Sequence, residues 1–275
     1  MHLARVSMIA GLNLLLLTVL LWAGAAPAQG LRGPFIEDMT STEVRDAVGT
    51  GKTTIIIPVG GVEQSGPYIA LGKHDVRVHV LAGIIARNLG NALVAPVVAY
   101  VPEGGIAPPT GHMRFAGTIS IPPAVFRATL MAAAQSFEAH GFKDVVLIGD
   151  HGGYQGDLKH VADDLNRGWA RTPARAHYIA AYYDSTQIAY VSALKAKGYS
   201  TAEIGTHAGL ADTSLMLAVD PTMVRSQHLR NSPPPGKADG VFGDPRGSTA
   251  GLGDLGVKEI IRQTTLAIQA DVRRR

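Results

Sequence analysis

Residues 144–153 read DVVLIGDHGG, an apolar run that leads directly into an acid, an imidazole and two glycines. The run shows no alternation of apolar and polar residues, which indicates a strand buried on both faces. A second run of this kind, TTIIIPV at residues 53–59, ends in Gly60 and Gly61. Because helical patterns follow both runs, we expect an α/β protein: a three-layer αβα fold with a mostly parallel central sheet.

Hydrophobic spacing extends this pattern along the chain. Residues 76–89 carry apolar side chains at helical intervals. Residues 40–43 (TSTE) resemble a capping box that opens a short helix through Val48. The other expected elements are strands at 92–101, 118–121 and 176–182, helices at 122–140, 156–170, 185–197, 212–219 and 255–272, and Gly/Pro-rich loops at 102–117 and 232–253.

Composition excludes several classes of protein and site. With 25 basic and 22 acidic residues among 275, the net charge of +3 is too small to indicate a nucleic-acid partner. The chain has no Cys, which excludes disulfides, zinc ribbons, iron–sulfur clusters and thiol nucleophiles. Any metal must therefore be held by His, Asp and Glu.

The first 28 residues have the pattern of a signal peptide. Arg5 supplies a positive charge, residues 8–22 are almost wholly apolar, and residues 26–28 (APA) offer a cleavage site. We expect an exported, periplasmic protein whose residues 29–275 form a single hydrolase domain with no membrane contact after cleavage. An uncleaved membrane anchor and a cytosolic protein are the alternatives, although the apolar run is short for a span of about 20 residues.

Side chains of metal-ligating type stand in three places near the predicted strand ends and loops. In a parallel sheet covered by helices, ligand sites lie beyond the carboxyl ends of the strands. Taken singly, each residue is as well explained by a structural role, but together they can converge on one cation. The candidates are Glu63, His74 and Asp75 after the first strand, His151 after the strand at 144–149, and His207 with Asp212 near the start of a later helix.

Five segments of the chain resemble the creatininase family (creatinine amidohydrolase and relatives). The resemblance spans roughly residues 36–268, with the motifs in the family's order. The segments are GVEQSGP at 61–67, HMRFAGTIS at 112–120, GDHGG at 149–153, HAGLADTS at 207–214, and the glycine-rich residues 243–250.

The resemblance implies a fold, a chemistry and a set of site residues. Members of the family bind two divalent ions, usually zinc or manganese, hydrolyse amide or cyclic-amide C–N bonds, and often form hexamers. By position, Glu63 matches a metal carboxylate and His151 a metal imidazole. His207 matches a catalytic imidazole, and Asp212 stands where the family has a catalytic or ligating Glu.

Departures from the family pattern lie in the first loop. Ser65 stands where the family has a His ligand of the second metal, and either His74 or Asp75 takes the place of the bridging Asp. We therefore expect one or two zinc or manganese ions, held by ligands drawn from Glu63, His74, Asp75 and His151. The predicted function is metal-dependent hydrolysis, through an activated water, of a small amide, lactam or peptide-like C–N bond. The alternative is a metal- or ligand-binding protein on the same scaffold that has lost hydrolysis.

Overall fold

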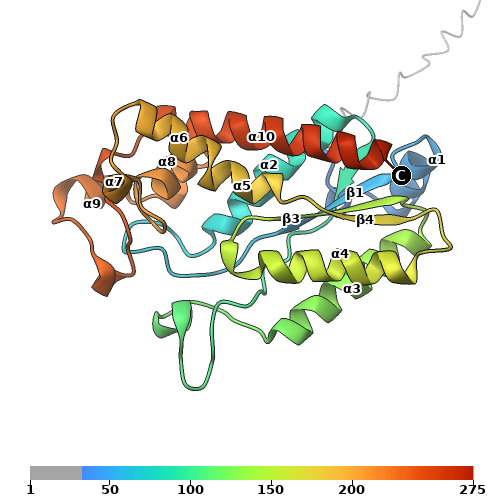
Figure 1. Ribbon diagram of the computed structural model, residues 1–275, viewed down its shortest axis with the longest axis horizontal. Coiled ribbons are helices and arrows are strands. Elements are labelled where there is room, and N and C mark those ends of the chain that lie inside the picture. Colours follow the sequence, from blue (N-terminus) through green and yellow to red (C-terminus); the bar gives the residue numbers. More distant parts are fainter. Residues whose placement is uncertain (1–32, 275) are drawn as a thin grey trace, which may run out of the picture. The chain divides into compact units, whose positions relative to one another are not determined.

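Four parallel strands form the central sheet of residues 33–274, the part of the chain that the computed structural model describes (Figure 1). They are β1 (Thr54–Val59), β2 (Ala92–Val94), β3 (Asp144–Gly149) and β4 (Arg175–Tyr178), in the spatial order β2-β1-β3-β4. Every residue of β1 and β3 is buried, and the two strands pair along their full length. The two apolar runs found in the sequence are thus the centre of a parallel sheet, as predicted.

Helices separate and flank these strands. Thr40 caps the first of them, and its side chain and that of Glu43 form the predicted capping box. The α-helices of the described residues are α1 (Ser41–Gly49), α2 (Lys73–Leu89), α3 (Pro123–Ala139), α4 (Gln155–Gly168), α5 (Ala181–Gln187), α6 (Ala189–Ala196), α7 (Thr201–Ile204), α8 (Leu210–Val219), α9 (Ser226–Asn231) and α10 (Ala250–Arg273).

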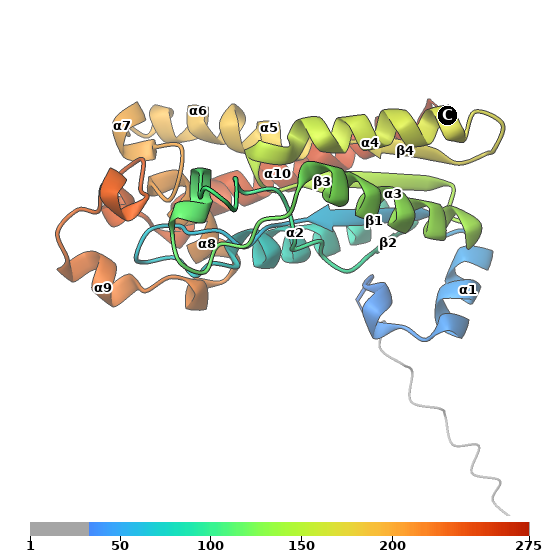
Figure 2. The same ribbon diagram turned by 90° about the horizontal axis from the view of Figure 1, so that it is seen from below.

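The helices lie in two layers, one on each face of the sheet (Figures 1 and 2). Successive side chains of β1 point to opposite faces, as the pleat of a strand requires. Ile55 and Ile57 pack in one apolar cluster with residues of α3 and α4, whereas Ile56 packs in another with residues of α2 and α10. The three-layer αβα prediction is confirmed.

Three predicted strands are shorter than expected or absent. The strand expected at 176–182 is β4, which ends at Tyr178, and residues 181 and 182 belong to α5. Residues 92–101 form only the three residues of β2, because Pro96 has no N–H with which to continue the ladder. Beyond it, Val98 makes a single parallel bridge with Val59. Residues 118–121 form no strand, and Ile119 donates one isolated hydrogen bond to the carbonyl of Val62.

Three helix boundaries also differ from the prediction. The helix expected at 185–197 is two helices, α5 and α6, which meet at Ile188. The last helix, α10, begins at Ala250, inside the expected loop, because Thr249 accepts a hydrogen bond from the N–H of Leu252 and caps it. The helix α2 begins at Lys73 rather than at residue 76, which places three polar residues in its first turn.

The predicted signal peptide lies outside the described residues, so its cleavage and the boundary at residue 29 stay predictions. Residues 33–274 belong to one unit by their contacts. Within residues 33–274, no helix is both long enough and apolar enough to cross a membrane.

Candidate metal centre and active site

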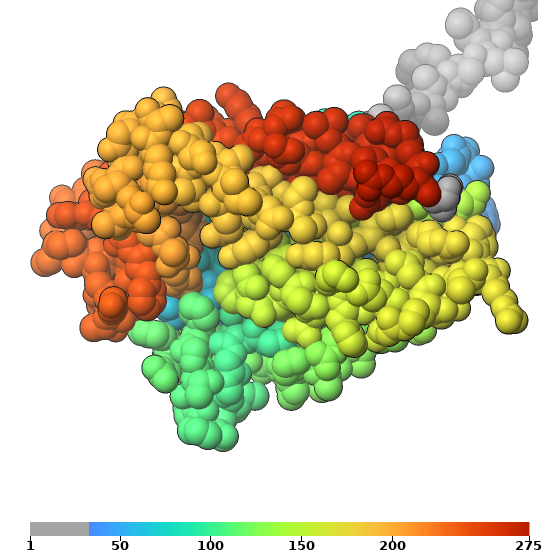
Figure 3. Space-filling view, viewed as in Figure 1, coloured from blue at the N-terminus to red at the C-terminus, as the bar shows by residue number. Residues whose placement is uncertain are grey.

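The candidate residues lie at the carboxyl ends of β1 and β3. Figure 2 shows the segment after β1, the loop 102–117 and helix α8 at this same end of the sheet. In the space-filling view, blue atoms from the segment near residues 60–75 are visible in a hollow between the orange and yellow-green parts of the surface (Figure 3). The topology therefore brings distant parts of the chain to one place.

The hydroxyl group of Tyr154 joins the ends of β1 and β3. It accepts hydrogen bonds from the backbone N–H groups of Asp150 and His151, at 3.1 and 3.0 Å, and donates to the carbonyl oxygen of Gly60 at 2.6 Å. Tyr154 is fully buried, so water does not compete for these bonds. The loop that carries Glu63 is in this way fixed beside His151.

Asp75 holds the same loop from the side of α2. Its Oδ1 accepts a hydrogen bond from the N–H of Gly61 at 2.8 Å. A Cβ atom on Gly60 would lie 2.0 Å from that oxygen, so the close approach requires glycine. Burial is the main cause that raises the pKa of Asp75 above its usual value. The structure thus shows Asp75 as an anchor of the loop, turned away from the other candidates.

Glu63 lies at the centre of the site and is fully buried. Its Oε1 lies 2.7 Å from Nε2 of His74 and 3.3 Å from Nζ of Lys73. Its Oε2 lies 3.0 Å from Nε2 of His112 and 3.5 Å from Nε2 of His151. Burial opposes the charge on Glu63, but Lys73 and the nearby imidazoles of His112 and His74 outweigh it and hold its pKa well below the usual range. One carboxylate therefore faces two different groups of side chains.

His74 is enclosed between two carboxylates. Its Nε2 lies 2.7 Å from Oε1 of Glu63 and its Nδ1 lies 2.5 Å from Oδ2 of Asp150. Burial disfavours the charged imidazole, yet the hydrogen bonds to Asp150 and Glu63 raise the pKa of His74 above its usual value. Both ring nitrogens are engaged with carboxylates, which leaves neither with a lone pair directed at an ion.

A group of four side chains offers ligand atoms to one point. Glu63, Glu103, His112 and His151 each contribute one ligand atom, and these four atoms lie within 4.8 Å of one another. In a tetrahedral site with bonds of about 2.0–2.1 Å, ligand atoms lie about 3.3 Å apart. The distances from Oε2 of Glu63 to Nε2 of His112 and His151, 3.0 and 3.5 Å, are close to that spacing.

The state of Glu103 is the strongest sign that this group suits a cation. Glu103 is buried, and neither of its carboxylate oxygens accepts a hydrogen bond from any described residue. Burial, followed by the negative charge of Glu63, raises the pKa of Glu103 to about 8. A divalent ion between the two carboxylates would satisfy both oxygens and remove the repulsion. Carboxylate and imidazole ligands suit Zn²⁺ and Mn²⁺.

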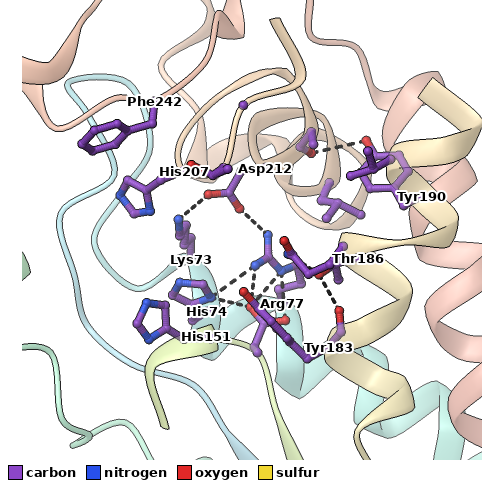
Figure 4. Close-up of a pocket in the computed structure, with 18 of the residues that line it drawn as sticks. Lys73, His74, Arg77, His151, Tyr183, Thr186, Tyr190, His207, Asp212 and Phe242 are labelled. Carbon is purple, nitrogen blue, oxygen red and sulfur yellow. Dashed lines mark hydrogen bonds and ion pairs between the residues drawn. The ribbon is translucent and has the colours of Figure 1, made fainter. Parts of the chain in front are cut away.

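Helix α2 also contributes two cations to the site (Figure 4). Lys73 and Arg77 are four residues apart, so they share one face of the helix. Both bind Asp212 of α8: Lys73 forms a close ion pair with Oδ2, and Nη1 of Arg77 lies 2.7 Å from Oδ1. Burial opposes the charge on Asp212, but Lys73 and then Arg77 lower its pKa well below the usual range. Asp212 therefore stays ionised, with both oxygens engaged.

His207 borders the other side of Glu63. Its Nε2 lies 2.9 Å from the backbone carbonyl oxygen of Gln64 and 3.1 Å from the side-chain amide nitrogen of Gln64, and its Nδ1 lies 3.6 Å from Oε1 of Glu63. In the tautomer that donates from Nε2 to this carbonyl, Nδ1 is unprotonated. Burial, followed by the charge of Lys73, lowers the pKa of His207 to about 4. The backbone of this residue is held by Phe242, whose N–H donates to the carbonyl of His207 at 2.9 Å.

These side chains line a cavity of about 230 Å³. Figure 4 shows Lys73 and His207 on one side of it and Tyr183 and Tyr190 on the other. Phe242, which is 45% exposed, also lines the cavity and comes from the segment predicted to be a loop or flap. Pockets for drug-sized molecules typically span about 300–1,000 Å³. The cavity is smaller than that range, so it suits a ligand smaller than a typical drug molecule.

The structure brings the six predicted site residues to one region, but their side chains contact different groups there. Glu63 and His151 fall in the four-residue group, and His207 and Asp212 line the cavity beside it. His74 contacts Glu63 without joining that group, and Asp75 contacts Gly61 instead. Successive residues of a helix point about 100° apart, so the side chains of residues 73–75 cannot all face one ion.

Three residues of the site were not predicted from the sequence: Glu103, His112 and Lys73. His112 carried a signal, because it begins one of the segments that resemble the creatininase family. Glu103 is a single acid in a Gly/Pro-rich loop and has no periodic or motif context. Lys73 precedes a predicted ligand, but its burial follows only from the packing of α2 against α8.

Comparisons with known sequences identify the family to which this chain is similar. A family model described as "Creatininase: Creatinine amidohydrolase" matches residues 37–268. The creatinine amidohydrolase of Pseudomonas putida is 26% identical over 205 residues, which cover 73% of this chain and 77% of the relative. The mycofactocin precursor peptide peptidase of Mycobacterium tuberculosis (strain CDC 1551 / Oshkosh) is 27% identical over 253 residues, covering 81% and 86%.

Solved structures share the fold. A crystal structure of creatinine amidohydrolase (creatininase) superposes with a TM-score of 0.73 at 22% identity, covering 87% of this chain and 98% of that chain. A structure described as "Creatininase Mn" has a TM-score of 0.73, with 22% identity and coverage of 87% and 99%. A creatininase variant described as Zn-Zn type has a TM-score of 0.70, with 22% identity and coverage of 87% and 98%.

Proposed function

Because this chain belongs to the creatininase family, we propose that it is a metal-dependent hydrolase of the C–N bond in a small amide, lactam or peptide-like substrate. The observation that carries the proposal is the pair of buried carboxylates, Glu63 and Glu103, which offer oxygens to the same point as two imidazoles at the edge of a cavity. The proposed ligands are Glu63, Glu103, His112 and His151.

Charge balance supports a cation at this point. Four carboxylates gather here, and Lys73, Arg77 and the imidazole of His74 pair with three of them, namely those of Glu63, Asp150 and Asp212. Glu103 faces Nδ1 of His151 at 3.5 Å, and burial lowers the pKa of that imidazole to about 3, so it carries no charge at pH 7 to balance Glu103. Zinc or manganese are the proposed ions, which agrees with the ligand types and with the Mn and Zn-Zn structures of the fold's neighbours.

When bound, a divalent ion lowers the pKa of a coordinated water from 15.7 to about 7 and polarises a carbonyl group. The side chains of the protein supply the rest. His207 is neutral at pH 7, and its free Nδ1 can accept a proton and return it to the leaving nitrogen, a contribution of about 10²–10⁴ in rate. The Lys73 ammonium is buried in the wall of the cavity between Glu63 and Asp212, where its positive charge favours negative charge that develops at the site.

Asp212 acts on these groups rather than on the substrate. Both of its oxygens are bound, one to Lys73 and the backbone N–H of Ala208, the other to Arg77. A carboxylate that stays ionised is a poor proton donor. We therefore assign Asp212 a positioning role: it fixes the ammonium of Lys73 and the start of α8, next to His207.

The volume of the cavity and the names of the relatives support the proposed substrate class. A volume of about 230 Å³ accommodates a small ring or the end of a peptide. Relatives in the family include a creatinine amidohydrolase and a peptidase for a precursor peptide. One structural neighbour is a creatininase variant complexed with creatine. The substrate class proposed for this chain covers both kinds of C–N bond.

The test combines metal content with turnover. Purified protein is stripped with a chelator and reloaded with Zn²⁺ or Mn²⁺. It is then assayed on a panel of cyclic ureas, lactams, small amides and peptides with varied C-termini. We expect turnover that needs the ion and that is lost in His151→Ala, while His140→Ala, at the exposed end of α3, keeps it. Bound metal without turnover on any substrate would favour the alternative, a binding protein that has lost hydrolysis.

A further inference from the structure

The two oxygens of Glu63 lie in chemically different surroundings. On the Oε1 side are the ammonium of Lys73, at 3.3 Å, and the imidazole of His74, at 2.7 Å. On the Oε2 side are the imidazoles of His112 and His151, at 3.0 and 3.5 Å, with neither group in hydrogen-bonding geometry to that oxygen. The first side already has its positive charge, and the second does not.

Lys73 is fixed in its place. The side chain is fully buried, and its ammonium is ion-paired with Asp212 as well as with Glu63. Asp212 is in turn held by Nη1 of Arg77, at 2.7 Å, and by the N–H of Ala208, at 3.1 Å. An ammonium with two carboxylate partners and no access to solvent cannot swing out to admit another cation without leaving both acids unpaired.

We propose that this chain holds a single divalent ion, on the Oε2 side of Glu63, and that the ammonium of Lys73 takes the place of a second cation on the Oε1 side. The inference rests on the proposed function and specifies its site. His207 then belongs to the ammonium side, since its Nδ1 faces Oε1 at 3.6 Å, whereas His112 belongs to the ion side. Two imidazoles whose ring centres lie 4.7 Å apart thus have different roles.

This arrangement makes one of the two cations beside Glu63 a permanent part of the chain. An ammonium is covalently part of the chain, so a chelator removes only the ion beside Glu103. A lysine also offers three N–H donors but no position for a water to coordinate. In this protein the ammonium therefore supplies electrostatic stabilisation, and activation of water is confined to the Oε2 side.

The experiment compares His112→Ala with His207→Ala in the full chain. Wild-type protein is stripped with EDTA, saturated with Zn²⁺ and desalted. Bound zinc is counted by native mass spectrometry and by elemental analysis, and the zinc Kd is measured by competition with a chromogenic chelator. His140→Ala, exposed and far along α3, is the control for the loss of an imidazole. Thermal unfolding of each variant confirms that it is folded.

We expect one zinc per wild-type chain. Loss of a residue that only hydrogen-bonds a metal ligand typically weakens metal binding by about 10–100-fold, and His112→Ala, which removes a proposed ligand, should raise the zinc Kd by more than that. His207→Ala should leave the zinc stoichiometry and the zinc Kd unchanged. Two zinc ions per wild-type chain would overturn the inference and leave the proposed function standing, as would weaker zinc binding in His207→Ala. No bound zinc or manganese in the wild type would instead refute the proposed function. If His112→Ala does not fold, the wild-type count and the His207→Ala result still decide.

Discussion

Oε2 of Glu103 lies 3.5 Å from Nδ1 of His151, yet neither oxygen of this buried carboxylate accepts a hydrogen bond from a described residue. A buried carboxylate without hydrogen bonds is costly in a folded protein. The surroundings of Glu103 therefore favour a bound cation, which would satisfy the carboxylate, over the metal-free state, in which the carboxylate has no hydrogen bond from a described residue.

The metal-free protein should lose stability as the pH rises. The pKa of Glu103 is about 8 in the folded state against a usual value of 4.5, so the folded state binds more protons than the unfolded state between these values. The buried imidazoles of His151 and His207, whose pKa values are lowered to about 3 and about 4, act in the opposite direction up to about pH 6.5. The free energy of unfolding of EDTA-treated protein should therefore fall through the contribution of Glu103 as the pH rises from about 6.5 to about 8.

Glu103→Gln should reverse this loss while removing the metal. A neutral amide of nearly the same shape avoids the buried charge, so EDTA-treated Glu103→Gln should be about 1–3 kcal/mol more stable than wild type at pH 8, with a smaller gain at pH 5. Urea unfolding at both pH values measures this. Glu37→Gln, at an exposed position, is the control. Equal stability of Glu103→Gln and wild type at pH 8 would show that Glu103 is not strained in the metal-free protein.

Lys73 and Asp212 should be strongly coupled in stability. Removing one member of a buried ion pair leaves an unpaired charge and typically costs about 3–5 kcal/mol. Lys73→Met and Asp212→Asn should each destabilise the protein by an amount of that order. The double variant should lose less than the sum of the two, because the mutual attraction of Lys73 and Asp212 is lost only once, while Glu63 and Arg77 lose one partner each, as they do in the single variants. Chemical denaturation of all four proteins gives the coupling energy, and a value near zero would contradict the pairing.

The sheet was predictable because its signal is local. Strands β1 and β3 are apolar throughout, since both faces are covered by helices, and their predicted and observed bounds agree within one residue. Residues 92–101 look equally apolar, but pairing depends on backbone N–H groups, and Pro96 lacks one. Hydrophobicity alone does not reveal where a ladder of hydrogen bonds stops.

The candidate site was predictable only in part, because its geometry is not local. Glu63 and His151 stand at strand ends, where a sequence can indicate them. Glu103 becomes a site residue only because the loop 102–117 folds back over His151. Lys73 becomes one only because α2 packs beside Asp212 of α8. Neither of these two packing contacts produces a pattern in the amino-acid sequence by which it could be predicted.

The single hydroxyl of Tyr154 should contribute measurably to the positions of Glu63 and His151. Tyr154→Phe removes the acceptor for two backbone N–H groups and the donor to the carbonyl of Gly60. Leaving buried groups unsatisfied should destabilise the protein by about 1–3 kcal/mol and also weaken zinc binding. Urea denaturation and zinc competition measure the two effects. Tyr100→Phe, at a side chain 61% exposed, should change neither.

The N-terminus offers a test of export that needs no structural information on residues 1–32. If residues 1–28 are a signal peptide, protein expressed from the full sequence in a bacterium should be recovered from the periplasm with Gln29 as its first residue. Intact mass and N-terminal sequencing measure this. Recovery in the membrane fraction at full mass would instead identify an uncleaved anchor.

His207 should act as a neutral base throughout the physiological pH range. Its pKa is lowered to about 4, and a neighbouring cation would lower it further, so Nδ1 stays free to accept a proton above pH 5. His207→Asn should lower kcat by about 10²–10⁴ with zinc content unchanged. The ratio of wild-type to variant kcat/KM should be constant from pH 5.5 to 8, because the imidazole does not titrate there. A ratio that rises steeply between about pH 6 and 7 would show an ordinary histidine pKa in the working enzyme, and with it a different proton carrier.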